Sequence, residues 1–393
     1  TSNVMIGEFQ IALELTEKAY NLSVKIQKKE HPDTLNILHS LAFIYSKLGD
    51  FSKAAELYKE EFILRSKVLG EEDSETIKSL TYLVYSYIKL GEIKKALEYH
   101  EKFYNIKCKI LGETHPDALS ILSELAVGYS EIGDKLKALE FYEKTYNLKC
   151  KVFGEENIDT LNTLNDLAYA YDKLGRRFKS RVLFNDLYKL RSKVLGEDHT
   201  DTLDSLSNYA DLENFFGEHE LALELIDKAY NLRCKVLGED HPDTLYSLHE
   251  LAFTHHKLRN YRKALELYKN EHKTRCDVFG EEHIDTLKAL NQLGVEYYKL
   301  GEYHTSMEIA EKSYKLCCKT LGETQSLTLT VLNNLALYHK LLGNLETALS
   351  LYNKLCPQLI LIYGSEHQMT LRNTTRLEEL IEQMKENNSK NDK

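Results

Sequence analysis

Apolar residues between positions 33 and 49 recur at helical spacing, with Leu35, Leu38 and Ala42 on one face. This pattern predicts an amphipathic helix, which we call helix A. Gly49 follows it, and glycine commonly ends a helix because it adopts the left-handed conformation without strain. A second and longer amphipathic stretch, helix B, then runs over residues 51–69 and stops at another glycine.

The helix pair recurs every 42 residues without an insertion. A Thr-Leu dipeptide marks the first turn of helix A in most copies, and Thr76-Ile77 and Ala118-Leu119 occupy the two remaining positions. The Thr-Leu copies begin at Thr34, Thr160, Thr202, Thr244, Thr286, Thr328 and Thr370. A fixed period of this length predicts units that stack into a solenoid, in which each unit contacts only its neighbours.

The residues that punctuate the helices follow the same period. Glycine closes helix A in every unit except one, where Arg259 takes its place. Three of the four prolines lie in the first turn of a helix A, where the missing N–H would have no partner anyway. The fourth, Pro357, lies inside the last helix B and is expected to kink it.

Residue identities at the packing positions distinguish between repeat families. Helix pairs of this period also suit HEAT repeats, but a propeller is excluded because strand alternation and tryptophan are absent. With each Thr counted as position 0, position 8 is small, position 11 usually tyrosine, position 20 alanine and position 24 often aromatic. The first full unit carries Ala42, Tyr45, Ala54 and Tyr58 there. The pattern resembles the tetratricopeptide repeat, which implies an all-α, right-handed solenoid of antiparallel helix pairs.

Two sequence motifs narrow the resemblance to one type of tetratricopeptide repeat. Leu-Gly-Glu-Asp-His-Pro-Asp-Thr-Leu occupies residues 237–245, and Leu-Asn-Asn-Leu-Ala occupies residues 332–336. With the 42-residue length, they resemble the kinesin-light-chain type of tetratricopeptide repeat. In that family the asparagine of Leu-Asn-x-Leu-Ala contacts cargo peptides, which implies this role for Asn165, Asn291 and Asn333.

The repeats divide the chain into four expected segments. Residues 1–33 form a half repeat, a helix B and a loop, and residues 34–369 form eight full units. Residues 370–384 form a polar capping helix, and residues 385–393 form a disordered tail. Because the first helix B has no helix A before it, we expect the chain to be part of a longer protein.

Composition and charge limit the function classes. The net charge of −10, without a basic run, argues against binding nucleic acid through its phosphates. No apolar stretch is long enough to span a membrane, so we expect a soluble, cytoplasmic protein. Five of the seven cysteines share one repeat position, too far apart to form disulfides with one another. No motif for a metal, a cofactor or catalysis is present.

Stacked A helices are expected to line a concave groove, with positions 2, 5, 9, 12 and 13 facing it. Amides would hydrogen-bond a peptide backbone, aromatic rings would receive its side chains, and lysines would attract its acidic residues. Alternatively, lysine near a helix end is favoured by the helix dipole alone. The candidate groove residues are Asn165, Asn291, Asn333, His249, Tyr85, Tyr169, Phe253, Tyr246, Tyr298, Lys89, Lys173, Lys257 and Lys299.

Two further groups of residues affect the expected ligand. Asp204, Asp211, Glu213 and Asn214 make the groove acidic near the fifth full unit, so a ligand should carry a basic or neutral residue there. Histidines recur in the loops before helix A, where polar turn residues are ordinary. The sequence therefore favours a non-catalytic scaffold that binds a protein or peptide segment, or a segment of its own parent chain. The alternative is a ligand-sensing domain of a larger signalling or defence protein.

Overall fold

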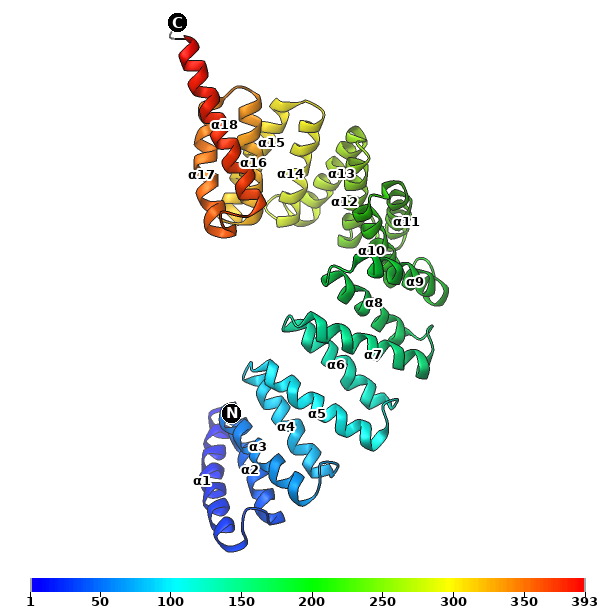
Figure 1. Ribbon diagram of the computed structural model, residues 1–393, viewed down its shortest axis with the longest axis vertical. Helices are drawn as coiled ribbons and strands as arrows, with labels where there is room; N and C mark the ends of the chain where they lie inside the picture. Colours follow the sequence, from blue (N-terminus) through cyan, green and yellow to red (C-terminus); the bar gives the residue numbers. More distant parts are fainter. Residues whose placement is uncertain (1, 392–393) are drawn as a thin grey trace. The chain divides into compact units, whose positions relative to one another are not determined.

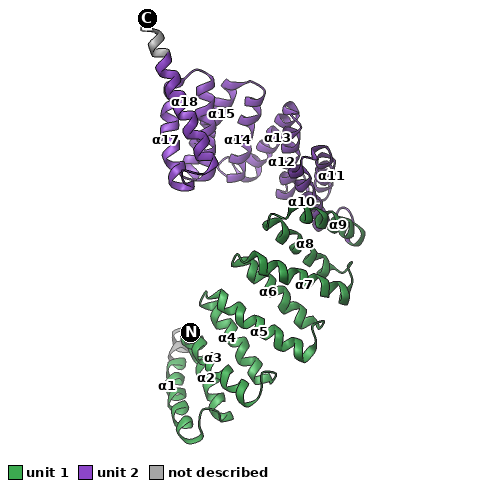
Figure 2. Ribbon diagram, in the orientation of Figure 1, with its two compact units in different colours: residues 1–194 green, residues 195–393 purple. Residues whose placement is uncertain are grey.

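The computed structural model describes residues 2–391, with side chains for residues 8–386, and all of the regular elements in that range are α-helices. The chain divides into two compact units, residues 1–194 and residues 195–393 (Figure 2). Within each unit, successive helices lie side by side and antiparallel, as α2, α3 and α4 do (Figure 1). This confirms the predicted all-α architecture of helix pairs.

The helices alternate between the two predicted kinds. The A helices are α2 (Pro32–Lys47), α4 (Ser74–Lys89), α6 (Pro116–Glu131), α8 (Ile158–Lys173), α10 (Thr200–Phe216), α12 (Pro242–Lys257), α14 (Ile284–Lys299) and α16 (Ser326–Leu341). The B helices are α1 (Ser2–Gln27), α3 (Phe51–Val68), α5 (Ile93–Leu111), α7 (Lys135–Phe153), α9 (Arg177–Leu195), α11 (His219–Leu237), α13 (Tyr261–Phe279), α15 (Tyr303–Thr320) and α17 (Leu345–Tyr363). Helix α18 (Gln368–Asn391) ends the array.

The recurring loop histidines cap the A helices. The Nδ1 atom of His31 accepts a hydrogen bond from the backbone N–H of Asp33 at 3.2 Å, which satisfies one of the free donors of the first turn. The same bond forms at His115, His199, His241, His283 and His367. Asp73 and Asn157 cap α4 and α8 in the same way. Capping therefore explains the histidine period.

The turn from helix A to helix B requires a left-handed residue. Gly49 has a φ of 84° there, and the glycines of the other repeats have similar values. Arg259, the exception in the sequence, has a φ of 61°. The backbone of this repeat therefore follows the same path with a side chain that disfavours it.

Small and aromatic residues hold the pairs together as predicted. Ala42 and Ala54 are fully buried where α2 meets α3, and the Tyr58 ring fills the space beside them. In three units the tyrosine at position 11 is bonded to the unit before it; in the first of them the Tyr45 hydroxyl donates to Glu17 on α1 at 2.6 Å. The same bond links Tyr129 to Glu101 and Tyr171 to Glu143.

The ends of the array differ from the expected segments. Helix α1 begins at Ser2 and occupies most of the predicted half repeat. Helix α18 continues to Asn391, so the segment predicted as a disordered tail is helical up to that residue, because it contains neither proline nor glycine. Residues 392–393 lie outside the described residues. Helix α17 runs through Pro357 without ending.

Candidate functional site

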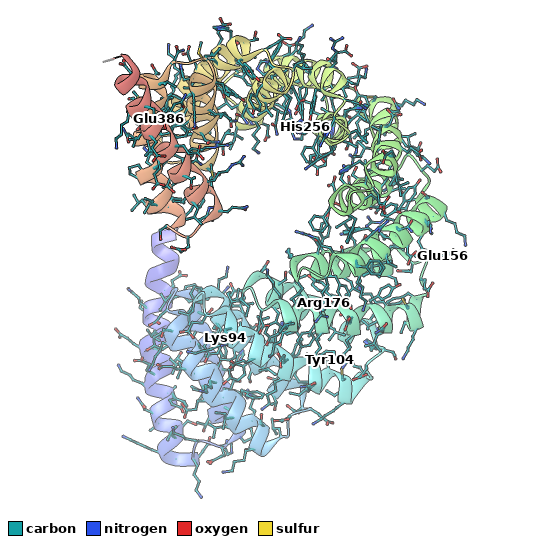
Figure 3. The ribbon with its side chains drawn as sticks, turned by 45° about the horizontal axis from the view of Figure 1, so that its top comes forward. Lys94, Tyr104, Glu156, Arg176, His256 and Glu386 are labelled. Carbon is teal, nitrogen blue, oxygen red and sulfur yellow. The ribbon has the colours of Figure 1, made fainter. Side chains whose placement is uncertain are left out.

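In unit 2 the A helices form one connected surface. Helix α10 contacts α12, and α14 contacts α16. Each time, the residue at position 12 of one A helix contacts the residue at position 10 of the next. Asn214 Nδ2 donates to Thr254 Oγ1 at 2.7 Å. His256, labelled in Figure 3, has its Nδ1 atom 2.5 Å from Oε1 of the buried Glu296. The Tyr298 and Tyr338 rings follow at 5.5 Å between centroids. We call this surface of α10, α12, α14 and α16 the A-helix face.

A chain of amide hydrogen bonds crosses this face. Arg376 Nη1 on α18 donates to Asn333 Oδ1 at 3.1 Å, and Asn333 Nδ2 donates to Asn334 Oδ1 at 3.3 Å. Asn334 Nδ2 then donates to Asn291 Oδ1 at 3.0 Å. Among the described residues, none accepts a hydrogen bond from Asn291 Nδ2. The chain of bonds therefore ends in a half-buried donor on α14.

The groove aromatics lie beside the predicted lysines. Lys257 Nζ lies 4.8 Å from the centre of the Phe253 ring on α12, and Lys299 Nζ lies 5.6 Å from that of Tyr298 on α14. These distances fit cation–π contacts, which hold each ammonium group on the face. Tyr246 is 45% exposed on α12. The face therefore presents rings and cations together.

His249 points into its own repeat. Its Nδ1 lies 3.2 and 3.1 Å from the two Glu271 oxygens, and Arg275 Nε donates to the same carboxylate at 2.7 Å. Burial is the largest single influence and lowers the pKa of His249, but Glu271 and Glu250 together raise it by more, so the net shift is upward. His39, Glu61 and Arg65 repeat this arrangement in unit 1. The histidines at position 5 therefore bind core carboxylates.

The acidic region predicted near the fifth full unit is largely neutralised. Arg233 Nη2 donates to Asp204 Oδ1 at 2.5 Å, and Glu213 is fully buried. Asp211 accepts a hydrogen bond from Tyr246 at 3.1 Å, and burial together with the neighbouring Glu250 raises its pKa to about 8. Because Asp204 is paired with an arginine and Asp211 accepts a hydrogen bond from a tyrosine, this region is less acidic than its sequence suggests.

In unit 1 the candidate residues lie on α4 and α8. Tyr85 and Tyr169 are both exposed, and Lys89 Nζ lies 5.4 Å from the centre of the Tyr85 ring. Asn165 lies on α8 beside Asp166, and the Lys173 backbone carbonyl accepts a hydrogen bond from Lys135. The structure thus gathers these five candidates on the A helices of one unit, and the other eight on those of unit 2.

Cysteines and other metal-ligating residues are spread along the described part of the chain. The seven cysteines are free thiols, and no three His, Cys, Asp or Glu side chains in that part are grouped to hold a metal ion. None of the helices described there combines the length and the apolar composition needed to cross a membrane.

Several solved structures resemble the chain. Nearly identical TPR-like repeats from Podosopora anserina, named after kinesin light chain, share 26% identity, with 53% of this chain and 98% of that chain covered and a TM-score of 0.40. Apo RapI shares 12% identity, with 72% and 97% covered and a TM-score of 0.51, which is a likeness of fold alone. BtubC from P. vanneervenii shares 20% identity, with 60% and 92% covered and a TM-score of 0.38.

The sequence itself matches a family model over most of its length. No curated protein matches the chain. The model described as "Tetratricopeptide repeat" matches residues 4–62, 75–151, 159–235, 205–273 and 285–360. The chain therefore belongs to the tetratricopeptide repeat family.

Proposed function

We propose that the protein is a non-catalytic scaffold whose A-helix face in unit 2 binds an extended segment of a partner protein. Stacked repeats offer extended surfaces of this kind, and family membership supports a protein partner in general. An extended segment needs donors for its backbone carbonyls and apolar surface for its side chains. The A-helix face carries both.

The observation that carries the proposal is the amide chain that ends at Asn291. Each bond in the chain orients the next amide, so Asn291 Nδ2 is fixed in direction before any ligand arrives. A half-buried donor without an acceptor gains a bond when a peptide carbonyl approaches, and its orientation costs no further ordering. Asn291 is therefore suited to hold a peptide backbone.

The rings and lysines on the same face give this surface its selectivity. Tyr298 lies two helical turns from Asn291 on α14, on the same side of the helix. Lys299 and Lys257 are held over rings, where they can also pair with acidic side chains of a ligand. The proposed ligand is a segment with aromatic and acidic residues.

Selection from a displayed library of linear dodecapeptides tests the proposal. The full chain is the target, and selected peptides are titrated by fluorescence polarisation. Asn291→Ala removes one hydrogen bond to the ligand and should weaken binding about 2- to 12-fold. Tyr298→Ala removes a ring and should weaken it more.

Asn353→Ala on the B helix α17 is the matched control, because Asn353 is an exposed asparagine away from the A helices. It should leave the affinity unchanged. If the Asn291 and Tyr298 variants bind every selected peptide as tightly as the parent chain does, the A-helix face is not the binding surface.

A further inference from the structure

A lysine on the B helices repeatedly pairs with an acid in the loop between repeats. The lysine lies 31 residues after the acid, as in Lys144 and Glu113, whose Nζ and Oε1 atoms are 3.1 Å apart. The other pairs are Lys102–Glu71 at 3.0 Å, Lys228–Glu197 at 3.0 Å, Lys312–Glu281 at 3.3 Å and Lys354–Glu323 at 2.8 Å. Five repeats therefore fill this position with their own lysine.

The same lysine covers an aromatic ring of the preceding repeat. Lys144 Nζ lies 5.0 Å from the centre of the Tyr104 ring, which is labelled in Figure 3. Lys102 covers Phe62 at 4.7 Å, and Lys354 covers Tyr314 at 5.6 Å. Each of these ammonium groups is thus bound by a carboxylate and a ring face together.

One repeat keeps the acid and the ring but replaces the lysine with a second acid. Asp186 on α9 stands at the lysine position, Glu155 at the loop position, and Tyr146 on α7 at the ring position. Two other repeats also lack the lysine, but neither has two acids. In one, the acid and the lysine have changed places, and Glu60 pairs with Lys29 at 2.6 Å. In the other, Asn270 stands at the lysine position opposite Glu239. Only the Asp186 repeat, among these positions in residues 2–391, places two carboxylates there.

A hollow lies at these residues. Tyr146, Glu155 and Asp186 line a space of about 350 Å³, together with the apolar side chains of Leu164, Leu183 and Leu190. Lys189 also lines it, and no ion pair joins it to either acid among the described residues. With two acids and one lysine, the lining of the hollow carries a net negative charge. Glu156, which follows Glu155 in the loop between repeats, is labelled in Figure 3. It lies at the opposite end of the helices from Arg176, which marks the turn between α8 and α9.

We propose that this hollow receives the lysine side chain of a partner protein, in the place that the chain's own lysine fills in five other repeats. The two carboxylates pair with the ammonium group, the Tyr146 ring lies beside it, and the leucines contact its methylene stem and the adjacent residues of the partner. The site is on the B-helix side of unit 1, separate from the A-helix face, and does not depend on the function proposed for that face.

Burial is the main cause of the raised pKa of the Tyr146 hydroxyl; the neighbouring Cys150 comes next, and Glu155 and Asp186 add smaller contributions. The ring therefore remains neutral and adds no repulsion of its own to the two carboxylates. A second ammonium group entering the hollow would therefore meet two carboxylates and only one lysine.

The test is a titration of the full chain with the peptide Gly-Ser-Leu-Lys-Leu-Ser-Gly, observed through leucine methyl NMR signals. Signals of Leu164, Leu183 and Leu190 should shift with saturation. The same peptide with acetyl-lysine, which has no charge, should bind about 10-fold more weakly. Asp186→Lys should abolish binding, because it places the chain's own ammonium group in the hollow.

Asp186→Lys is expected to fold normally, since lysine is the residue at this position in five repeats, and circular dichroism checks this. Asp277→Lys on the exposed surface of α13 changes the net charge equally and should bind like the parent chain. Glu155→Gln with Asp186→Asn keeps the shape and should also lose binding. The proposal is overturned if the methyl signals do not move, if the acetyl-lysine peptide binds equally, or if folded Asp186→Lys still binds.

Discussion

Replacing Glu271 with alanine tests whether position 5 histidines belong to the core or to the ligand surface. Glu271 is 1% exposed, and it accepts hydrogen bonds from Arg275 at 2.7 Å and from His249 at 3.2 and 3.1 Å. If this cluster holds α12 on α13, its loss should destabilise that repeat strongly.

The structure allows the magnitude to be worked out. Glu271→Ala leaves the Arg275 guanidinium 8% exposed, with one remaining bond at 3.4 Å to the Leu245 carbonyl. Removing one member of a buried ion pair costs about 3–5 kcal/mol, because the other charge stays buried and unpaired. Replacing both Glu271 and Arg275 with leucine removes both charges, and should cost clearly less than Glu271→Ala alone.

Urea unfolding gives the free energy change, and hydrogen exchange of α12 and α13 locates it. Glu266→Ala is the matched control on the same helix, because Glu266 is exposed and pairs only with Lys263 at 3.5 Å. That control should cost less than about 1 kcal/mol. If Glu271→Ala costs no more than the control, the cluster does not hold the repeat, and His249 returns to the residues available for a ligand.

Three further outcomes follow from the structure. Arg259→Gly should raise the free energy of unfolding by about 1 kcal/mol, because glycine relieves the left-handed strain at φ 61°, and a loss of stability in urea unfolding would contradict this. His249→Asn should destabilise the protein more at pH 5.5 than at pH 8.5. The pKa of His249 is higher in the folded chain than in the unfolded chain, so its stabilisation is fully present below about 6.5 and is lost as the pH rises through the folded-state pKa. Asp211→Asn should gain stability relative to the parent as the pH rises from about 5 towards 8, because the unfolded parent releases the Asp211 proton in this range while the folded parent keeps it, and parallel pH profiles would refute this.

The period predicted the fold because helix-forming faces are local properties. Leu35, Leu38 and Ala42 are buried as their spacing indicates, and the glycine turns are left-handed. The role of the loop histidines was not predicted, because a cap depends on the angle at which one ring meets one N–H group. Composition alone indicates only a polar turn.

The candidate site was predicted in outline. Sequence spacing identified which residues lie on the A helices, but not which position of one helix meets which position of the next. That register is set by the angle between repeats, so the bonds from Asn334 to Asn291 and from Arg376 to Asn333 could not be predicted. For the same reason, Asp211 was taken as a free acid, although Glu250 and Tyr246 on the next A helix surround it.

The side-chain amide of Asn291 gives the most direct test of the account. In a transverse-relaxation-optimised ¹⁵N–¹H spectrum of the full chain, a peptide selected from the linear library is titrated in. We predict that the Asn291 amide signal shifts in a saturable way as Nδ2 donates to the peptide backbone, while the Asn353 signal on α17 stays in place. If a bound peptide leaves the Asn291 signal unchanged, the A-helix face does not hold the ligand, and the central claim is wrong.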